Sequence, residues 1–319
     1  MRFHKDAGYG AIGVQGTPFR GTGKIFIVGD SSTVNLSMLQ ELWTIDQDGV
    51  SRFFTTIDAA VGACTADAGD IIFVMPGHTE TMAAAQTILA DIAGISIIGI
   101  GRGSLRPNLN YTSENGTLAV TARDITIKNL RFTTDAANVT TAIDIGAAKD
   151  CTIEDCEWFE DTANENFLAC IRTNATANSA DGLTVKGCRV IISDVDGQNF
   201  IKFRNNEDRI TVKDCFISMG ANDDDGVIEV PAGNALTNVD ITWNRVKRLQ
   251  TRTVGTSAYR GLFISANTTT NSGIVAYNII HHATDTAETL ISLTGAGMFE
   301  NYGTAMVTTS GFLRPQADA

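Results

Sequence analysis

Ile125-Thr126-Ile127-Lys128-Asn129-Leu130 decides the fold, because the pattern of this hexapeptide returns along the chain at a nearly constant interval. Its first, third and last residues are apolar, and polar residues lie between them. Alternation at period two predicts a short strand with one buried face. Clear copies follow at Cys151–Cys156, Leu183–Cys188 and Ile210–Cys215, a looser copy is Val239–Asn244, and weaker copies begin near Ile95, Gly273 and Gly297.

A second strand pattern, apolar-x-apolar, precedes each copy, for example at Ile143–Ile145 and Ile228–Val230. The copies start 24–34 residues apart. That interval is too short for a propeller blade, and the leucine-asparagine consensus of leucine-rich repeats is missing. We therefore predict an all-β fold, a right-handed single-stranded parallel β-helix of about 7–9 coils, in which successive coils pair at about 4.8 Å.

The sixth position of the repeat is expected to form a column inside the solenoid. It contains Cys156, Cys188 and Cys215 in successive coils, followed by Asn244 and Asn278. Stacked asparagines can hydrogen-bond one another and the adjacent backbone. None of the six cysteines forms a CxxC pair, so we interpret the column as structural, with reduced buried thiols and neither metal nor cofactor.

The open end of a solenoid must be covered, since an unpaired strand edge invites further strand addition. Ile57, Ala60, Val61 and Cys64 have the spacing of an amphipathic helix, which predicts an N-terminal cap. A strand is expected at 24–28 and another at 70–75, with a short helix at 36–43. The predicted organisation is an N-terminal arm at 1–23, the cap with the first coil at 24–93, the parallel β-helix at 94–311 and a C-terminal tail at 312–319.

Charge is distributed unevenly along the chain. The net charge is −12, which disfavours nucleic acid and anionic membranes as partners. Residues 1–24 nevertheless have a net charge of +3, leaving −15 for the remainder. This basic, glycine-rich arm is expected either to lie against an acidic partner surface or to be an ordinary flexible N-terminus. Its basic residues are Arg2, Lys5, Arg20 and Lys24.

No apolar run reaches the roughly 18 residues that a membrane helix needs, and we see no secretory signal in the sequence. We therefore expect synthesis in a cytoplasm, which suits reduced cysteines.

The segments 54–60 and 68–80 resemble the N-terminal module of pectate-lyase-like β-helix proteins: a capping helix, then Gly69-Asp70, a buried strand, Pro76-Gly77 and a polar turn. The segments 29–35 and 95–103 are similar to virion-associated members encoded by tailed bacteriophages. This resemblance covers about residues 24–310. It implies the fold far more than the function, because one fold serves lyases, hydrolases, tailspikes and capsid decoration proteins.

The resemblance also implies which site residues an enzyme of this fold would carry. Related hydrolases have paired aspartates, a Gly-His-Gly motif and an Arg-x-Lys motif on neighbouring coils. This sequence lacks Gly-His-Gly, and we interpret His78 as a turn residue. Arg245-Val246-Lys247 has the Arg-x-Lys spacing without the accompanying motifs, so a solvated outer face is expected.

The densest acidic cluster is Asp223-Asp224-Asp225, which precedes a strand. Carboxylate oxygens suit Ca²⁺, but alternating side chains let at most two of the three converge, so these are weak metal candidates. Asp194 and Asp196 precede the corresponding strand one coil earlier. If the chain is an enzyme, its cleft is expected between these two loops. Aromatic residues are few, and we expect no recurrence of them at one repeat position.

These observations favour a structural virion protein, namely a capsid decoration or cement protein on the capsid exterior. Its expected partners are the major capsid protein, bound through the arm, and further copies of itself in a homotrimer. The alternatives are a tailspike-like polysaccharide depolymerase or lyase, and a non-catalytic receptor-binding tail protein. An enzyme needs opposed carboxylates in a cleft, whereas a decoration protein needs an arm that orders when bound.

Overall fold

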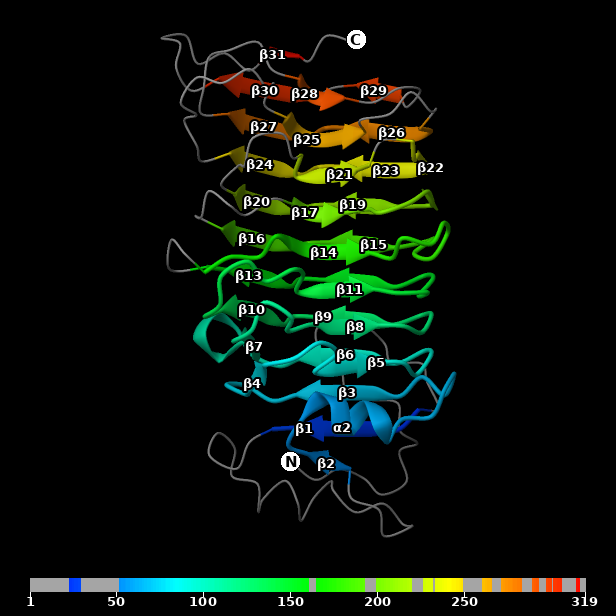
Figure 1. The fold of residues 1–319 in the computed structure, drawn as a ribbon, viewed down its shortest axis with the longest axis vertical. Coiled ribbons are helices and arrows are strands. Elements are labelled where there is room, and N and C mark those ends of the chain that lie inside the picture. The colour runs from blue at the N-terminus through cyan, green and yellow to red at the C-terminus, as the bar shows by residue number, and fades with distance from the viewer. Residues whose placement is uncertain are drawn as a thin grey trace, which may run out of the picture.

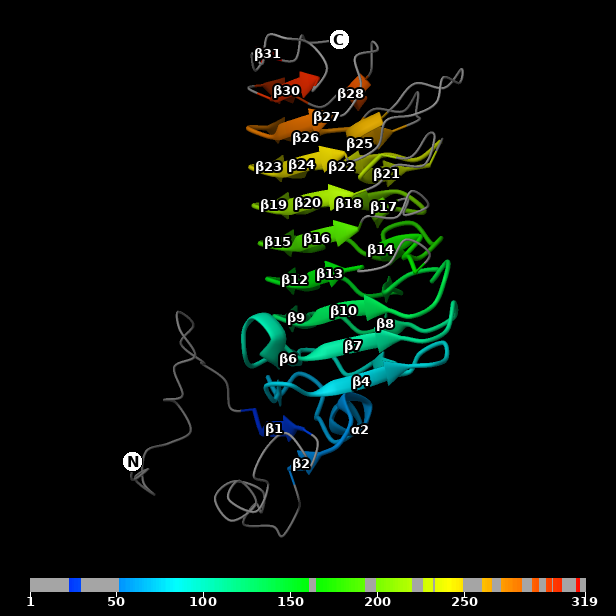
Figure 2. The same ribbon diagram turned by 90° about the vertical axis from the view of Figure 1, so that its left-hand side faces the viewer.

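Strands from successive repeats lie side by side in long sheets, which wind into a right-handed parallel β-helix (Figures 1 and 2). This confirms the fold predicted from the repeat. The computed structural model describes residues 23–29, 52–160, 165–192, 199–219, 226–231, 233–248, 260–265, 271–282, 289–292, 297–299, 301–305 and 314–315.

Three sheets form the walls of the solenoid, and neighbouring coils contribute neighbouring strands to each. The first sheet contains, in spatial order, β2 (Phe53–Phe54), β1 (Ile25–Val28), β3 (Ile71–Val74), β6 (Ser96–Gly99), β9 (Thr126–Lys128), β12 (Thr152–Glu154), β15 (Thr184–Lys186), β19 (Thr211–Lys213), β23 (Val239–Thr242), β26 (Gly273–Ala276) and β29 (Gly297–Phe299). The second contains β4 (Thr79–Met82), β7 (Asn108–Tyr111), β10 (Arg131–Thr134), β13 (Glu157–Phe159), β16 (Arg189–Ile192), β20 (Phe216–Met219), β24 (Arg245–Arg248), β27 (Ile279–His282), β30 (Tyr302–Ala305) and β31 (Arg314–Pro315). The third contains β5 (Ile88–Ala90), β8 (Leu118–Val120), β11 (Ile143–Ile145), β14 (Ala169–Thr173), β17 (Asn199–Lys202), β21 (Ile228–Val230), β25 (Arg260–Ser265) and β28 (Thr289–Ser292).

Pairings within the described sheets are parallel, except that β31 lies antiparallel to β30. Two short strands, β18 (Glu207–Asp208) and β22 (Leu236–Thr237), pair at the corner between the third and first sheets. The register is constant in the central coils: Ile127 lies beside Ile153, and Ile153 beside Val185. The hexapeptide therefore occupies the same place in each of these coils.

Burial follows the position in the hexapeptide. The third residue is buried in each of these coils, as at Ile127, Ile153 and Val212, whereas the second and fourth residues lie on the outer face of the first sheet. The fifth residue turns the chain toward the second sheet with a positive φ, which is 56° at Asn129 and 54° at Asp155. Asn, Asp and Gly tolerate this left-handed conformation better than other residues, which explains the polar fifth position.

The sixth position forms one buried column along the solenoid. Cys156, Cys188 and Cys215 occupy it in three successive coils, and their thiols are free. Asn244 and Asn278 follow, and Asn301 extends the column by a further coil. Each asparagine amide donates to a backbone carbonyl of the previous coil. The Nδ2–O distances are 2.9 Å from Asn244 to Val212, 2.8 Å from Asn278 to Ile241 and 2.8 Å from Asn301 to Val275.

The N-terminal end is covered by α2 (Ile57–Gly62), which buries Ile57, Ala60 and Val61 against the first coil (Figure 1). Cys64, which the spacing placed on the same helical face, lies beyond the helix. Glu80 accepts the Ile57 N–H at 3.0 Å, and the Thr56 side chain caps the helix at Ala59. None of the described helices is long and apolar enough to span a membrane.

Several predicted segments fall outside the described residues. These are the arm up to residue 22, the short helix at 36–43 and most of the tail at 312–319. Lys24, counted among the basic arm residues, directly precedes β1, and its backbone N–H donates to the buried Asp70 carboxylate at 2.6 Å. Asp70 also accepts the Thr65 N–H at 2.7 Å, so it joins the cap to the first coil.

We predict that Asn278→Leu lowers the free energy of unfolding by about 2–4 kcal/mol, because it leaves the buried Asn244 N–H without its acceptor and removes the amide that donates to the buried Ile241 carbonyl. Urea unfolding followed by circular dichroism measures this. Cys215→Asn is the matched control in the same column, with the Val185 carbonyl 4.0 Å from Cys215 Sγ as a partner for the new amide. We expect it to cost less than about 1 kcal/mol; equal losses in the two variants would contradict the hydrogen-bonded column.

Candidate functional site

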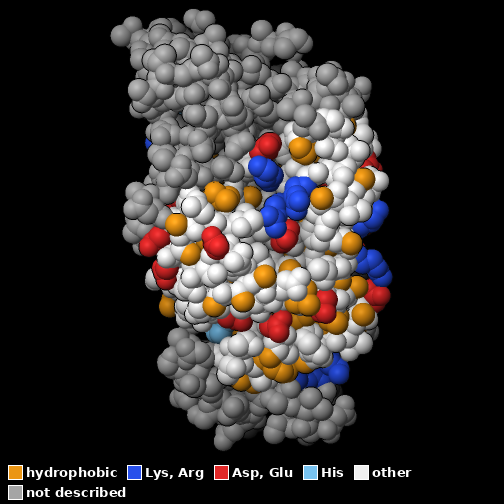
Figure 3. All heavy atoms as spheres, in the orientation of Figure 1, with side chains coloured by type: hydrophobic (Ala, Val, Ile, Leu, Met, Phe, Trp, Pro, Cys, Tyr) orange, Lys and Arg blue, Asp and Glu red, His pale blue; other side chains and the backbone are white. Residues whose placement is uncertain are grey.

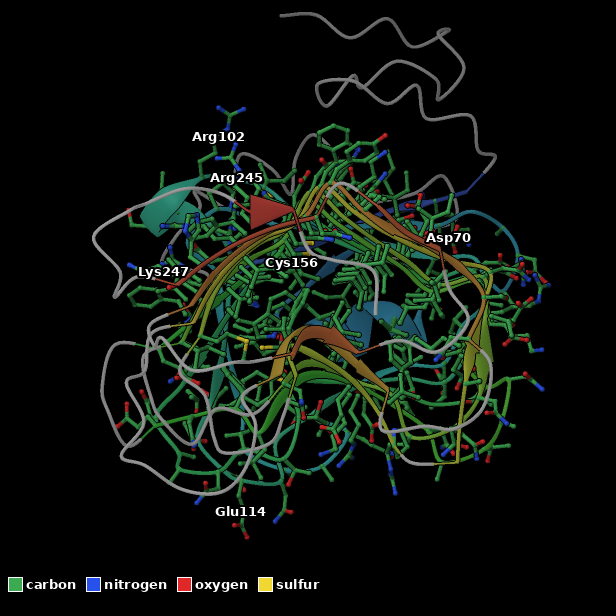
Figure 4. The ribbon with its side chains drawn as sticks, turned by 90° about the horizontal axis from the view of Figure 1, so that it is seen from above. Asp70, Arg102, Glu114, Cys156, Arg245 and Lys247 are labelled. Carbon is green, nitrogen blue, oxygen red and sulfur yellow. The ribbon has the colours of Figure 1, made fainter. Side chains whose placement is uncertain are left out.

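The corner between the first and second sheets carries the chemically richest surface of the described chain. Here the fifth residue of each repeat turns the backbone, the sixth points inward, and the seventh begins a strand of the second sheet with its side chain outward. Seen along the solenoid axis, Arg102 and Arg245 project from this corner, whereas Cys156 points inside and Asp70 lies at another corner (Figure 4). Because coils stack in register, side chains at equal positions form surface columns parallel to the axis.

The C-terminal half of this corner is aromatic. We call Phe216, Trp243, Arg245, Tyr277 and Ile279 the aromatic step; together with Asp214 they line a shallow hollow. Trp243 is 53% exposed, and its ring stacks on that of Tyr277 with centroids 4.5 Å apart and planes 13° from parallel. Both rings occupy the fifth position of adjacent coils. Aromatic residues therefore do recur at one repeat position, and the contrary expectation from the sequence was wrong.

The aromatic step has a conformational cost. Trp243 has a φ of +62° and Tyr277 a φ of +59°, at a position where earlier coils have Asn129, Asp155 and Gly187. A bulky residue in the left-handed region costs roughly 1–2 kcal/mol relative to its preferred conformation. Stacking of the two rings offsets about 0.5–1.5 kcal/mol of this. A strained backbone that places exposed rings is a common feature of binding sites.

The N-terminal half of the corner is cationic. A hollow of about 720 Å³ lies beneath the loop that contains Arg102. We call it the arginine hollow; its charged lining residues are Arg102, Arg106, Lys128, Arg131, Arg189, Asp155 and Glu157. Glu157 is one of these lining residues, with 6% of its side chain exposed, and it contacts guanidinium groups from three different coils.

The other described charges mostly tie one coil to the next. On the third sheet, Arg172 contacts Asp144 at 2.9 Å and Lys202 contacts Glu229 at 3.3 Å. Figure 3 faces this sheet and shows Lys and Arg side chains gathered beside Asp and Glu side chains. Pairs of this kind contribute little each, typically about 0–1 kcal/mol, so they align coils without forming a site.

The corner between the third and first sheets contains a buried carboxyl group, that of Glu207. Its oxygens accept hydrogen bonds from the Ala180 N–H at 2.8 Å and the Ser179 hydroxyl at 3.1 Å. Burial raises the pKa of Glu207 to about 7, in spite of these hydrogen bonds, and the nearby Asp181 raises it further. The group therefore titrates near neutral pH. No sequence signal marked it, because a glutamate before a repeat strand has the appearance of an exposed residue.

The sequence-predicted candidates are scattered rather than brought together. Arg245 and Lys247 are exposed on the outer face of β24, beside Phe216 and Ser218 of the previous coil. His78 is buried, and its Nε2 lies 3.4 Å from Glu80, next to the end of α2. Asp194, Asp196 and the Asp223–Asp225 cluster lie outside the described residues. Within the described ranges, no three His, Cys, Asp or Glu side chains gather as a metal site requires.

Two thiols of the sixth-position column stay protonated at neutral pH. Burial raises the pKa of Cys156 to about 12 and that of Cys188 well above its ordinary value. The thiolate is the nucleophilic and metal-binding form, so the thiols of Cys156 and Cys188 are unreactive at neutral pH.

Comparison with known proteins found little. No family model matches the chain, and no curated protein sequence matches it. Among solved structures, it is similar to the deglycosylated pectin methylesterase of Aspergillus niger, with 12% identity over 92% of this chain and 90% of that one and a TM-score of 0.48. It is also similar to the ORF18 protein of Geobacillus virus E2, with 13% identity over 85% of this chain and 62% of that one and a TM-score of 0.32. At TM-scores below 0.5, neither likeness bears on function, and the fold rests on the strand pairings.

We predict that the protein loses stability as pH rises through about 7, because Glu207 has a higher pKa when folded than its ordinary value of 4.5. The stabilising contribution of its protonated form is complete below pH 4.5 and lost above pH 7. In thermal unfolding between pH 5 and pH 9, the free energy of unfolding of Glu207→Gln should rise by about 1–3 kcal/mol relative to that of wild type at the alkaline end. Glu154→Gln, on the outer face of β12, is the control; an identical pH profile for wild type and Glu207→Gln would refute the assignment.

Proposed function

We propose that this parallel β-helix protein is a structural component of a tailed-bacteriophage virion, and specifically a decoration or cement protein on the capsid exterior. The basic arm, with Arg2, Lys5 and Arg20, would lie on an acidic groove of the major capsid protein. The acidic body would project from the shell as a homotrimer. Binding of this kind stabilises a shell by mass action and needs no chemistry.

The observation that carries the proposal is the continuity of the solenoid. One hydrophobic core runs from Phe26 to Ile280, and most outer-face charges of the described coils pair between coils. Such a body is a rigid rod, in which each coil is fixed by two neighbours. Rigidity suits a protein that reinforces or extends a particle. The resemblance of the segments 29–35 and 95–103 to virion-associated proteins of tailed bacteriophages supports the same assignment.

The charge distribution supports attachment through the arm. Residues 1–24 have a net charge of +3, whereas the remainder has −15. A capsid surface that attracts the arm therefore repels most of the body, which orients the rod away from the shell. Long-range orientation of this kind weakens when salt screens the charges.

We predict that deletion of residues 1–23 abolishes attachment to capsids and leaves the melting temperature nearly unchanged, because the described fold begins at the first strand. Cosedimentation of purified protein with shells that lack it measures attachment, and attachment of the full chain should weaken between about 50 and 300 mM salt. Neither form is expected to release reducing ends or unsaturated products from host polysaccharide. Full occupancy by the truncated protein, or turnover by either form, would contradict the proposal.

The aromatic step favours a second candidate function, a receptor-binding tail protein that recognises a host glycan without cleaving it. An exposed tryptophan face flanked by Asp214 and Arg245 combines an apolar surface with polar groups that fix orientation. The strained φ of Trp243 indicates that its position is maintained at a cost to stability.

Trp243→Asn separates this candidate from a purely structural role of the ring. Asparagine is the residue found at the same position in Asn129, so the variant should be as stable as wild type or more stable by about 1 kcal/mol. If the step binds glycan, the variant should lose affinity for host surface oligosaccharides several-fold in calorimetric titrations. Ile274→Ala, which alters an exposed apolar residue of the next coil, is the control. Unchanged glycan affinity in Trp243→Asn would remove the second candidate.

A further inference from the structure

The arginine hollow holds more positive charge than its own acids neutralise. Its lining contains five basic side chains and two acidic ones, on a chain whose net charge is −12. Lys128 lies 3.0 Å from Glu154 and 3.5 Å from Asp155, so its charge is neutralised. Arg106, Arg131 and Arg189 share the single carboxylate of Glu157. Two of these arginines are partly shielded from water, with side-chain exposure of 20% for Arg106 and 26% for Arg131, whereas Arg189 is 56% exposed. Cations held together in such surroundings attract an anion more strongly than the same cations dispersed over a surface.

Glu157 shows which chemistry the hollow accepts. Its Oε2 lies 2.9 Å from Arg131 Nε and 2.8 Å from Arg131 Nη2, so one carboxylate oxygen accepts from two donors of the same guanidinium. Its Oε1 accepts from Arg189 Nη1 at 2.8 Å, and Arg106 Nη1 lies 3.8 Å from Oε2. Burial raises the pKa of Glu157, but the hydrogen bonds and charges of these arginines outweigh burial and leave the pKa below its ordinary value. The carboxylate is therefore charged.

One carboxylate among three guanidinium groups leaves two positive charges over. Each guanidinium has five N–H donors, and the contacts to Glu157 use two from Arg131 and one from Arg189. In addition, Arg106 Nε is buried without a hydrogen-bond partner in the described structure. One arginine would be enough to pair with Glu157 and hold neighbouring coils together. The surplus donors therefore indicate a ligand that the chain itself does not supply.

We propose that the arginine hollow binds carboxylate groups of an acidic polypeptide segment on a partner protein. The inference rests on the proposed function in one respect, that the partner is a protein. Arg131 and Arg189 are two coils apart, about 10 Å along the axis, and an extended segment spans that distance in about three residues. Two acidic side chains on such a segment can reach both arginines. Figure 4 shows Arg102 of the adjoining loop projecting from the same corner.

A long nucleic acid fits less well. Its phosphates would follow the hollow for a short distance and then meet the acidic remainder of the chain, which has a net charge of −15 beyond the arm. A short segment with two carboxylates matches the two positive charges that Glu157 leaves over among Arg106, Arg131 and Arg189. The hollow and the arm then both favour an acidic partner surface.

The test is a titration of the full-length protein with a fluorescein-labelled peptide of about ten residues rich in Asp and Glu, followed by fluorescence anisotropy at about 50 mM salt. We expect Arg189→Gln and Arg106→Gln each to weaken binding by about tenfold, since a charged hydrogen bond contributes about 1.5–3 kcal/mol. Glu157→Gln should strengthen binding, because it releases guanidinium groups from their internal carboxylate. Arg172→Gln, which removes an arginine paired on the third sheet, is the matched control and should leave affinity unchanged.

Three results would overturn the inference. These are no binding by wild type, equal weakening in Arg172→Gln and Arg189→Gln, or weaker binding by Glu157→Gln with an unchanged melting temperature. A single-stranded DNA of equal charge is titrated in parallel, and tighter binding of the DNA would overturn the assignment to a polypeptide. Because the titration uses isolated protein, its failure is distinct from failure of the virion proposal, which the arm deletion tests on capsids.

Discussion

Each coil of the solenoid completes its backbone hydrogen bonds on the coils before and after it, so all coils must turn at the same places. This constraint sets the rest of the structure. A residue in the left-handed region must stand at the corner after each strand of the first sheet, as Asn129, Asp155 and Asp214 do. Side chains that share a position are then held about 4.8 Å apart in columns. Neighbouring side chains in one column must be able to pack against or hydrogen-bond one another, which explains the free thiols and the hydrogen-bonded asparagines inside the core.

The same constraint shapes the outer surface. The seventh residue of each repeat, which directly follows the turn, forms one such column on the outer surface. It contains Arg131, Glu157 and Arg189 in three coils, then Phe216 and Arg245. Stacking brings Glu157 between two arginines without any loop having to fold for the purpose. Trp243 and Tyr277 are stacked for the same reason. Surface chemistry on this scaffold thus follows from coil register, and a ligand that uses it must extend along the axis.

Much of this could be predicted from the sequence, because period-two alternation and a fixed repeat interval are local signals. The hexapeptide identified the first sheet and the Cys156–Asn278 column. Extending the repeat by one residue would also have revealed Arg131, Glu157 and Arg189, which have the spacing of the repeat itself. Arg106 could not be found in this way, because it lies on a loop outside the repeat. Likewise, the burial of Glu207 depends on packing against Ser179 and Ala180 of the previous coil, which no periodicity encodes.

A binding role on a virion is the central claim, and the number of copies per particle tests it most directly. Quantitative mass spectrometry of purified virions, with the major capsid protein as internal standard, measures this number. A decoration protein that covers the shell should be present in hundreds of copies, in a fixed ratio to the capsid protein. A count of a dozen or fewer would place the protein at the tail instead, and its absence from virions would contradict the account.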